Sequence, residues 1–411
     1  MKSDLDALMQ ERGVDALLVV GPGFHNPAMT YLSGGGHMTQ ADLVKRRGQA
    51  PVLFCRSMER EEAARTGLPT YVIDEYPMGE FIKQAGGDLL QATALRYQRM
   101  LTDLSLTQGR VALYGQMDAG ISYSLFSAIS QLLPGLQVFG EMGRPLLLAA
   151  MATKDAQEIE RIRTIGRITT SVVGDTADFI TSHAVRNDVV VKKDGAPLTI
   201  GEVKQQIDLW LAQRGAENPE GTIFAIGHDA GVPHSTGINS DPLRLGQMIV
   251  FDIFPREAGG GYFYDMTRTW CLGYAPDEAQ ALYQDVWNAY QTLRGELALG
   301  APTHRYQDRV CDLFEAGGHP TLRQNPATTN GYVHSLGHGV GLHIHENPFF
   351  RSGPAEEFLE PGVVITLEPG LYYPERGLGA RVEDTLWACP DGQFEPLAEY
   401  PYDLVLPMQQ G

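Results

Sequence analysis

Four carboxylates and one histidine lie in apolar or glycine-rich segments of the C-terminal half of the chain, where an ionised side chain is costly to bury. Each lies on or beside a short run that is typical of a buried strand. They are Asp252 in MIVFDIFP, Asp265 in YFYDMTRTW, His338 in SLGHGVGLHIHE, Glu368 in VVITLEPGLYY and Glu383 in GARVEDTLW. Because a buried carboxylate needs a cationic partner, the pattern predicts strands that meet around a shared cation site.

The composition of this residue set indicates which cation would suit it. Oxygen-rich ligation with a single nitrogen favours divalent manganese, cobalt or zinc. A structural zinc site would instead favour cysteine and histidine. The alternative, unrelated acids in a protein core, could account for any one of these residues but not for five.

The length of 411 residues favours two domains, which we expect at residues 1–150 and 151–411. The first domain alternates between helical and strand patterns, which favours an α/β layer architecture. Helices are predicted at 59–65 and 87–99, and strands at 16–20, 51–55, 70–73 and 111–114. We find no phosphate-binding loop and no cluster of metal-ligand residue types in this domain, so we interpret it as a scaffold or oligomerisation domain.

The second domain combines helices with strands that suit antiparallel pairing, which predicts an α+β architecture. Isoleucines at a spacing of three across residues 159–168 indicate an amphipathic helix. Thr199 and Glu202 form a capping-box pattern for another helix that ends at Gly215, and a third helix is predicted over 277–300. Strands are predicted at 222–226, 248–253, 262–271, 363–367 and 381–387.

The order and contexts of the five residues resemble the metallopeptidase family that includes methionine aminopeptidase, aminopeptidase P and prolidase. The resemblance spans residues 151–411 and implies the pita-bread fold. Residues 1–150 are similar, more weakly, to the creatinase-like N-terminal domain of prolidase and aminopeptidase P. The expected fold class is therefore α+β, with a smaller α/β domain before the pita-bread domain.

The resemblance also implies roles for the five residues. Asp252 would chelate one metal ion, and Asp265 and Glu383 would bridge two. His338 and Glu368 would complete the second ion, and manganese is the expected metal, with cobalt or zinc as alternatives. Two such ions can hold a hydroxide, polarise a carbonyl and stabilise a tetrahedral oxyanion.

Further candidates surround the expected metal site. The resemblance places His234 and His345 where they contact substrate or stabilise the transition state, and it makes Glu368 a proton shuttle. His334 would line the pocket, and the hydroxyl of Tyr372 would help to stabilise the tetrahedral intermediate. Arg381 lies two residues before Glu383, so on a continuous strand both side chains would face the pocket. We interpret Arg381 either as a group that orients the bridging carboxylate or binds a substrate carboxylate, or as part of an outer salt bridge.

The spacing of the first two ligands departs from the usual family pattern. Asp252 and Asp265 are 13 positions apart, two more than is usual. Glycines at 259–261 could absorb the insertion at a hairpin tip without moving either ligand. We therefore expect the metal site to be kept, whereas the spacing leaves open how the substrate rim near the hairpin is built.

These observations predict a metal-dependent exopeptidase that cleaves Xaa-Pro bonds, and an Xaa-Pro dipeptidase (prolidase) before an Xaa-Pro aminopeptidase (aminopeptidase P) or a broader aminopeptidase. A second hypothesis keeps the fold but changes the reaction, as in relatives that act on creatine or on carbon–sulfur bonds. A third is a non-catalytic binding module. Relatives of the creatine-cleaving and binding types lack ligands that this chain has.

The net charge and the cysteine pattern restrict which partners and which cellular compartment we expect. A formal net charge of −18 argues against nucleic acid or an anionic membrane as partner. Four scattered cysteines without a CxxC pair favour reduced thiols, and the first residues lack the pattern of a signal peptide. We expect a cytoplasmic homodimer that acts on small peptides.

Overall fold

The computed structural model describes residues 4–351 and 357–409. The chain forms two compact units. One comprises the residues up to Met151 together with Gly259–Gly261, and the other comprises Ala152–Ala258 and the chain from Tyr262 onward. Within the described part, no helix is both long enough and apolar enough to cross a membrane. The four cysteines are buried and unpaired.

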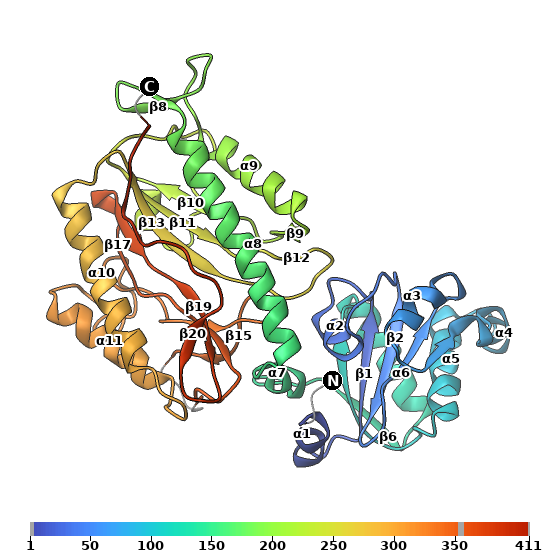
Figure 1. Ribbon diagram of the computed structural model, residues 1–411. Coiled ribbons are helices and arrows are strands. Elements are labelled where there is room, and N and C mark those ends of the chain that lie inside the picture. Colours follow the sequence, from blue (N-terminus) through green and yellow to red (C-terminus); the bar gives the residue numbers. More distant parts are fainter. Residues whose placement is uncertain (1–3, 352–356, 410–411) are drawn as a thin grey trace. The chain divides into compact units, whose positions relative to one another are not determined.

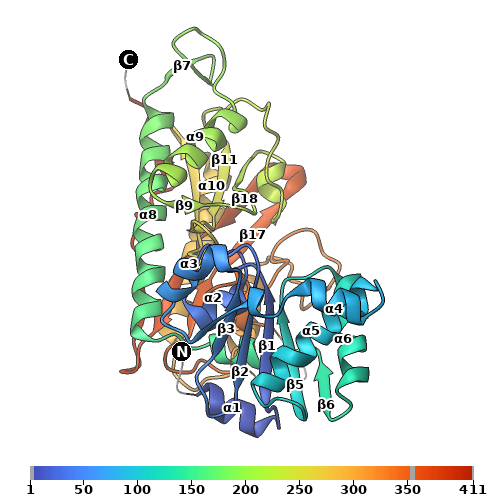
Figure 2. The ribbon, with the colours of Figure 1, turned by 90° about the vertical axis from the view of Figure 1, so that its right-hand side faces the viewer.

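A mixed six-stranded sheet forms the centre of the first unit. Its strands are β1 (Ala16–Gly21), β2 (Ala41–Arg46), β3 (Val52–Cys55), β4 (Thr70–Val72), β5 (Gly109–Gly115) and β6 (Leu136–Phe139). They lie side by side in the order β4-β3-β2-β1-β5-β6 (Figure 2). Strand β1 pairs antiparallel with β2 and parallel with β5. Its apolar run is buried, as a central strand covered on both faces requires.

Helices complete the α/β architecture that the alternating pattern predicted. They are α1 (Leu5–Glu11), α2 (Pro27–Ser33), α3 (Arg60–Arg65), α4 (Met78–Gln84), α5 (Leu89–Asp103), α6 (Ala119–Leu132) and α7 (Leu146–Met151). Side chains of α5 and α6, among them Tyr97 and Ile129, pack in one core with Leu18 of β1 and Phe54 of β3. The predicted strands and helices of this domain are present, whereas strands β2 and β6 and helices α2, α4, α6 and α7 were not predicted.

Four long helices and two larger sheets build the second unit. The helices are α8 (Ala156–Thr181), α9 (Ile200–Gln213), α10 (Asp277–Glu296) and α11 (His304–Ala316). Figure 1 shows α8 and α9 on one side of the strands and α10 and α11 on the other. The predicted capping box of Thr199 and Glu202 is present at the start of α9, and Gly215 follows the end of that helix with φ +77°.

One of the larger sheets has the order β10-β11-β13-β21 and the other the order β15-β14-β16-β19-β20. Their strands are β10 (Ile223–Ile226), β11 (Met248–Ile253), β13 (Met266–Leu272), β14 (His338–Gly339), β15 (Glu346–Phe349), β16 (Val364–Leu367), β19 (Asp384–Ala388), β20 (Phe394–Pro396) and β21 (Val405–Leu406). A bridge between Thr267 and Glu383 joins the two sheets. Two-stranded pairs complete the unit: β7 (Ala184–Arg186) with β8 (Val189–Val191), β9 (Ala216–Glu217) with β12 (Arg256–Glu257), and β17 (Gly370–Tyr373) with β18 (Leu378–Arg381).

The predicted strand at 381–387 is wrong as one continuous element. Arg381 ends β18, where it pairs with Gly370 of β17. Asp384 begins β19, where it pairs with Leu367 of β16. The chain changes partner sheets between these residues, so Glu383 lies at a break rather than inside a strand.

Two other element boundaries differ from the prediction. Strand β13 starts at Met266 rather than at 262, because the amide of Phe263 donates to Gly341 and that of Tyr264 to Pro255. Helix α10 ends at Glu296 rather than at 300. Here the hydroxyl of Tyr306 accepts from the amide of Ala298 and donates to the carbonyl of Glu296, which replaces a further helical turn.

Candidate metal centre and active site

The five predicted ligands come together in the second unit although they come from five different segments. Asp252 lies near the end of β11, Asp265 directly precedes β13, and His338 opens β14. Glu368 follows β16, and Glu383 lies at the break between β18 and β19. All five line one cavity of about 410 Å³. The two larger sheets therefore each contribute ligands to a single site.

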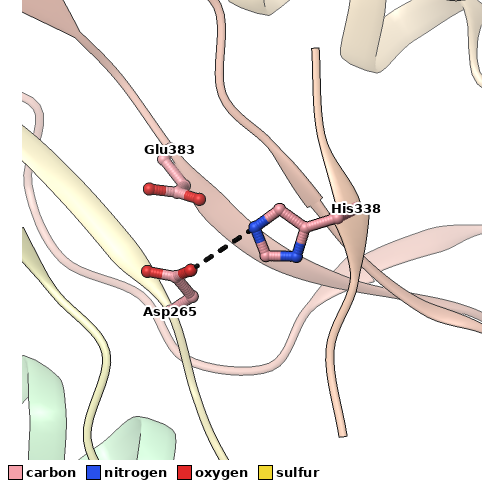
Figure 3. A group of neighbouring side chains, drawn as sticks. All are labelled: Asp265, His338 and Glu383. Atoms are coloured by element: carbon pink, nitrogen blue, oxygen red, sulfur yellow. Dashed lines mark ion pairs between the residues drawn. The ribbon is translucent and has the colours of Figure 1, made fainter. Parts of the chain in front are cut away.

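Asp265, His338 and Glu383 form the tightest group, with ligand atoms that all lie within 4.8 Å of one another (Figure 3). Nε2 of His338 is 3.7 Å from Oδ2 of Asp265 and 3.5 Å from Oε1 of Glu368. Nδ1 of His338 lies 3.0 Å from the carbonyl of Gly339, which can only accept, so Nδ1 carries the proton. The lone pair of Nε2 therefore points at the carboxylates, as a metal ligand requires.

The electrostatics of the group fit a cationic guest. Burial, with the charges of Glu383 and Asp252, raises the pKa of Asp265 well above its usual value. Burial, with the charges of Glu368 and Asp252, does the same for the pKa of Glu383, and burial raises the pKa of Glu368 to about 8. Oδ1 of Asp252 and Oδ1 of Asp265 are buried without a hydrogen-bond partner. Such unsatisfied carboxylate oxygens are the donors that divalent ions take up.

Asp252 is held from the side by Arg381. Nη2 of Arg381 donates to Oδ2 of Asp252 over 2.6 Å, and Nη1 donates to the hydroxyl of Tyr372 over 2.7 Å. Nε of the same guanidinium donates to Oγ1 of Thr267 over 3.0 Å. Arg381 thus lies beside the ligands as predicted, but its ion pair is with Asp252 rather than with Glu383.

Threonine hydroxyls orient two further carboxylates. Thr267 donates to Oε2 of Glu383 over 2.6 Å. Thr366 donates to Oε1 of Glu368 over 3.3 Å. The sequence analysis missed both threonines, although Thr267 lies two positions after Asp265, the spacing that brings side chains to one face of a strand.

The three candidate imidazoles line the same cavity, whereas Tyr372 does not. The His345 ring packs against that of His338, with centroids 4.4 Å apart. Nε2 of His334 lies 2.9 Å from the hydroxyl of Tyr372, which is fully buried behind it. Burial lowers the pKa of His334 to about 3, so its imidazole is neutral near pH 7. His234 also lines the cavity wall. Tyr372 lies behind the wall, in contact with His334.

A buried ion pair supports Glu383 from behind, and the sequence analysis missed it. Nη1 of Arg268 donates to the carbonyl of Glu383 over 2.8 Å, and Nη2 donates to Asp384 over 2.9 Å. The other oxygen of Asp384 accepts from the hydroxyls of Tyr290 and Tyr402. The sequence offered one signal for this pair: a charged residue on each of two strand-like runs, Arg268 in DMTRTW and Asp384 in VEDTLW.

The remaining wall of the cavity is partly apolar. Its apolar side chains, none of them predicted, are Ile223, Phe254, Ile344 and Phe349. Glu220 adds an exposed carboxylate at the same cavity. A pocket with one apolar side and one polar, ligand-bearing side suits a small amphipathic guest.

Comparisons with known proteins agree with this geometry. Residues 160–388 match metallopeptidase family M24, and residues 2–141 match the creatinase/prolidase N-terminal domain. The chain is 34% identical over 194 residues to an Xaa-Pro dipeptidase of Pyrococcus furiosus, an alignment that covers 46% of this chain and 51% of that protein. It is 28% identical over 253 residues to an uncharacterized peptidase of Bacillus subtilis, which covers 61% and 67% respectively. The chain thus spans about half to two thirds of the length of these relatives.

Solved structures show the same fold along nearly the whole chain. A dipeptidase from Pyrococcus horikoshii OT3 superposes with a TM-score of 0.74 at 21% identity, covering 98% of both chains. An X-Pro aminopeptidase from Thermotoga maritima superposes with a TM-score of 0.72 at 22% identity, covering 97% of this chain and 99% of that one. The predicted pita-bread fold with its creatinase-like N-terminal domain is thereby confirmed. Since the family match takes in more than half of the chain, the protein belongs to metallopeptidase family M24.

Proposed function

We propose that this protein is an exopeptidase that hydrolyses Xaa-Pro dipeptides with two divalent metal ions, manganese in the first place. The observation that carries the proposal is the cavity in which four carboxylates and a neutral His338 converge beside three further imidazoles. Family membership and relatives named Xaa-Pro dipeptidase support the same reading.

The metal ions would be held by Asp252, Asp265, His338, Glu368 and Glu383. When bound, they would supply Lewis-acid polarisation of the scissile carbonyl and a nucleophile at neutral pH. The chain's own contribution is to hold these ligands rigidly. The hydroxyls of Thr267 and Thr366, the Arg381 guanidinium and the carbonyl of Gly339 each fix one ligand side chain.

Proton transfer and charge stabilisation fall to the groups on the cavity wall. Glu368 has Oε1 3.5 Å from His338 and Oε2 3.9 Å from His334, so it lies between the ligand group and the imidazoles. In this position it can accept a proton from the attacking water and pass it to the departing nitrogen. His234 and His345 can donate hydrogen bonds to the oxyanion and to the substrate.

The apolar wall of the cavity suits a substrate with a proline ring. An Xaa-Pro bond is a tertiary amide, so the enzyme has no substrate N–H to bind at the scissile position. A site for it must recognise the ring by shape, and Ile223, Phe254, Ile344 and Phe349 provide an apolar surface beside the ligands.

Arg381 and Tyr372 take a positioning role in this proposal. Arg381 already donates to Asp252, to Thr267 and to the Tyr372 hydroxyl, so little of its guanidinium is left for a substrate carboxylate. Tyr372 reaches the cavity only through Arg381 and His334. We therefore assign the salt-bridge interpretation to Arg381.

A panel of three peptides tests the function. The manganese-loaded protein is expected to cleave Ala-Pro, to cleave Ala-Ala poorly and to leave Ala-Pro-Ala intact. Efficient cleavage of Ala-Pro-Ala would make the protein an Xaa-Pro aminopeptidase instead. Equal turnover of all three would overturn proline specificity and leave a broader aminopeptidase.

His345→Ala tests the role of the cavity wall in the same assay. We expect kcat for Ala-Pro to fall more than KM rises, because the contact of His345 is strongest in the transition state. His183→Ala is the matched control, since the His183 imidazole lies outside the cavity, where it bonds to the carbonyl of Phe179 and packs on the Phe179 ring. A rise in KM at constant kcat would instead make His345 a ground-state binding residue.

A further inference from the structure

The segment that carries His345 lies outside regular secondary structure. Residues 340–345 connect β14 to β15, and both Ile344 and His345 line the cavity. Two backbone hydrogen bonds hold the turn at Gly341: its amide donates to the carbonyl of His343 over 3.1 Å, and its carbonyl accepts from the amide of Phe263 over 2.8 Å. A strand ladder therefore does not fix the position of the His345 imidazole.

The carboxylate of Glu346, the next residue in the chain, fixes this turn instead. Oε1 of Glu346 accepts from the amide of His343 over 3.0 Å, so it holds the turn two residues before His345. Oε2 accepts from Nζ of Lys154 over 2.8 Å. The side chain of Glu346 is 0% exposed and that of Lys154 is 1% exposed, so solvent does not screen the pair.

Lys154 is anchored at the other end of the pair. Its amide donates to the carbonyl of Gly362 over 2.8 Å, and its Nζ also donates to the carbonyl of Ala152 over 3.3 Å. Thr153 pairs with Val363, directly before β16, the strand that Glu368 follows. The ion pair therefore ties the turn that carries His345 to the strand that delivers Glu368.

The backbone at Gly341 packs closely against the Glu346 carboxylate. A Cβ added at Gly341 would lie 2.3 Å from Oε2 of Glu346. Because the glycine backbone passes directly over the carboxylate, a shift of the carboxylate must move the turn.

Stability alone does not explain why a charged pair occupies this place. The cost of desolvating two ions roughly cancels their attraction, and a well-packed apolar pair would give equal or greater stability. A carboxylate at position 346, however, offers two fixed acceptors in one place, and the ammonium determines which way it faces.

We propose that Lys154 and Glu346 are positioning residues that set the His345 imidazole relative to the metal ligands. The proposal rests on the catalytic role given to His345 in the proposed function. The pair does not touch the cavity: neither residue is among its lining. Its effect on turnover is exerted through the backbone of His343 and His345.

The experiment uses four variants of the full-length, manganese-loaded protein. Glu346→Gln keeps the shape but sets an amide N–H₂ against either the His343 amide or the Lys154 ammonium, both of which are donors. Lys154→Met leaves the carboxylate without its cation. The double variant Lys154→Met, Glu346→Gln leaves the amide oxygen free to accept from His343 with no opposing ammonium. Val173→Ala, in the buried face of α8, is a control for loss of stability alone.

For each variant, kcat and KM on Ala-Pro are measured with metal content and melting temperature. Each single variant is expected to lower kcat by about 10- to 100-fold, the effect of a displacement near 1 Å, with KM and metal content nearly unchanged. The double variant is expected to recover most of the lost kcat, so the two substitutions couple. Val173→Ala is expected to lower the melting temperature and leave kcat unchanged.

Other outcomes overturn the proposal in distinguishable ways. If both single variants keep wild-type kcat while His345→Ala lowers it, the ion pair does not position His345. If the double variant loses as much kcat as the two single variants combined, the pair does not act as a unit. If His345→Ala keeps full kcat, the role of His345 in the proposed function fails, and the inference fails with it. Should Lys154→Met not fold, Glu346→Gln and the double variant, which holds no buried charge at either position, still decide between these outcomes.

Discussion

Replacing Arg268 tests whether the buried ion pair behind Glu383 holds the metal centre in place. All five N–H donors of this guanidinium are used, and its side chain is 1% exposed. One donor pairs with the carboxylate of Asp384 and the others donate to the carbonyls of Thr267, Glu383, Tyr400 and Pro401. Arg268 therefore links a ligand segment to the C-terminal segment of the unit.

The expected magnitude follows from the burial of the partner. Arg268→Met would leave the Asp384 carboxylate buried without its cationic partner, with only the hydroxyls of Tyr290 and Tyr402 to donate to it. Breaking a buried pair from one side costs about 3–5 kcal/mol of unfolding free energy. Arg268→Lys keeps the charge but offers three donors instead of five, so we expect a smaller loss, about 1–3 kcal/mol. Adding Asp384→Asn to Arg268→Met removes the uncompensated charge and should recover part of the loss.

Urea unfolding of the metal-free protein, followed by tryptophan fluorescence, measures these losses. The four tryptophans, at positions 210, 270, 287 and 387, all belong to the second unit, so the signal reports the unit that holds the site. Manganese affinity measured by calorimetry should fall about 10- to 100-fold in Arg268→Met, because an outer support of a ligand is lost. Wild-type stability and affinity in Arg268→Met, or no recovery in the double variant, would refute the reasoning.

Three further predictions concern the metals, the pH dependence and the assembly. Asp265→Ala and Glu383→Ala are expected to abolish hydrolysis of Ala-Pro and to reduce manganese binding from two ions per chain, whereas near-wild-type turnover in either would refute a two-metal centre. Burial raises the pKa of Asp42 from 3.8 to about 6, against the hydrogen bond from Tyr97, so the folded state holds the extra proton, and the contribution of Asp42 to stability should fall by about 2 kcal/mol as pH rises from 4 to 7. Asn does not titrate, so the difference in unfolding free energy between pH 4 and pH 7, measured by urea titration with circular dichroism, should change in Asp42→Asn by the contribution of Asp42. Light scattering at micromolar concentration is expected to show a homodimer, and a monomer would contradict that proposal.

The sequence predicted the ligand set because each ligand carries its own local signal. An acid inside an apolar run, such as Asp252 in MIVFDIFP, is conspicuous without knowledge of any contact. The helix starts are local in the same way: Thr199 and Glu202 were predicted, and the equivalent box of Asp155 and Glu158 at α8 could have been found from the same pattern.

What could not be predicted depends on partners far away in the chain. Arg268 and Asp384 are 116 positions apart, and Lys154 and Glu346 are 192 positions apart. Neither pair has a periodic or spaced pattern that would connect its members. The partner of Arg381 was missed for a related reason, because the change of sheets after Arg381 breaks the strand geometry from which its orientation relative to Glu383 was inferred.

The charge balance of the cavity fits the two divalent ions that we propose. Asp252, Asp265, Glu368 and Glu383 would carry four negative charges when ionised, His338 is neutral because burial lowers its pKa to about 3, and Arg381 returns one positive charge through Asp252. One divalent ion would leave a buried excess of one negative charge, which a proton on Glu368 would have to neutralise, since burial raises the pKa of Glu368 to about 8. Two divalent ions reverse the sign and leave one positive charge. In the proposed function, that residual positive charge would stabilise the negative charge that develops on the substrate, so buried carboxylates that are costly without a cation would suit the metal-loaded site to peptide hydrolysis.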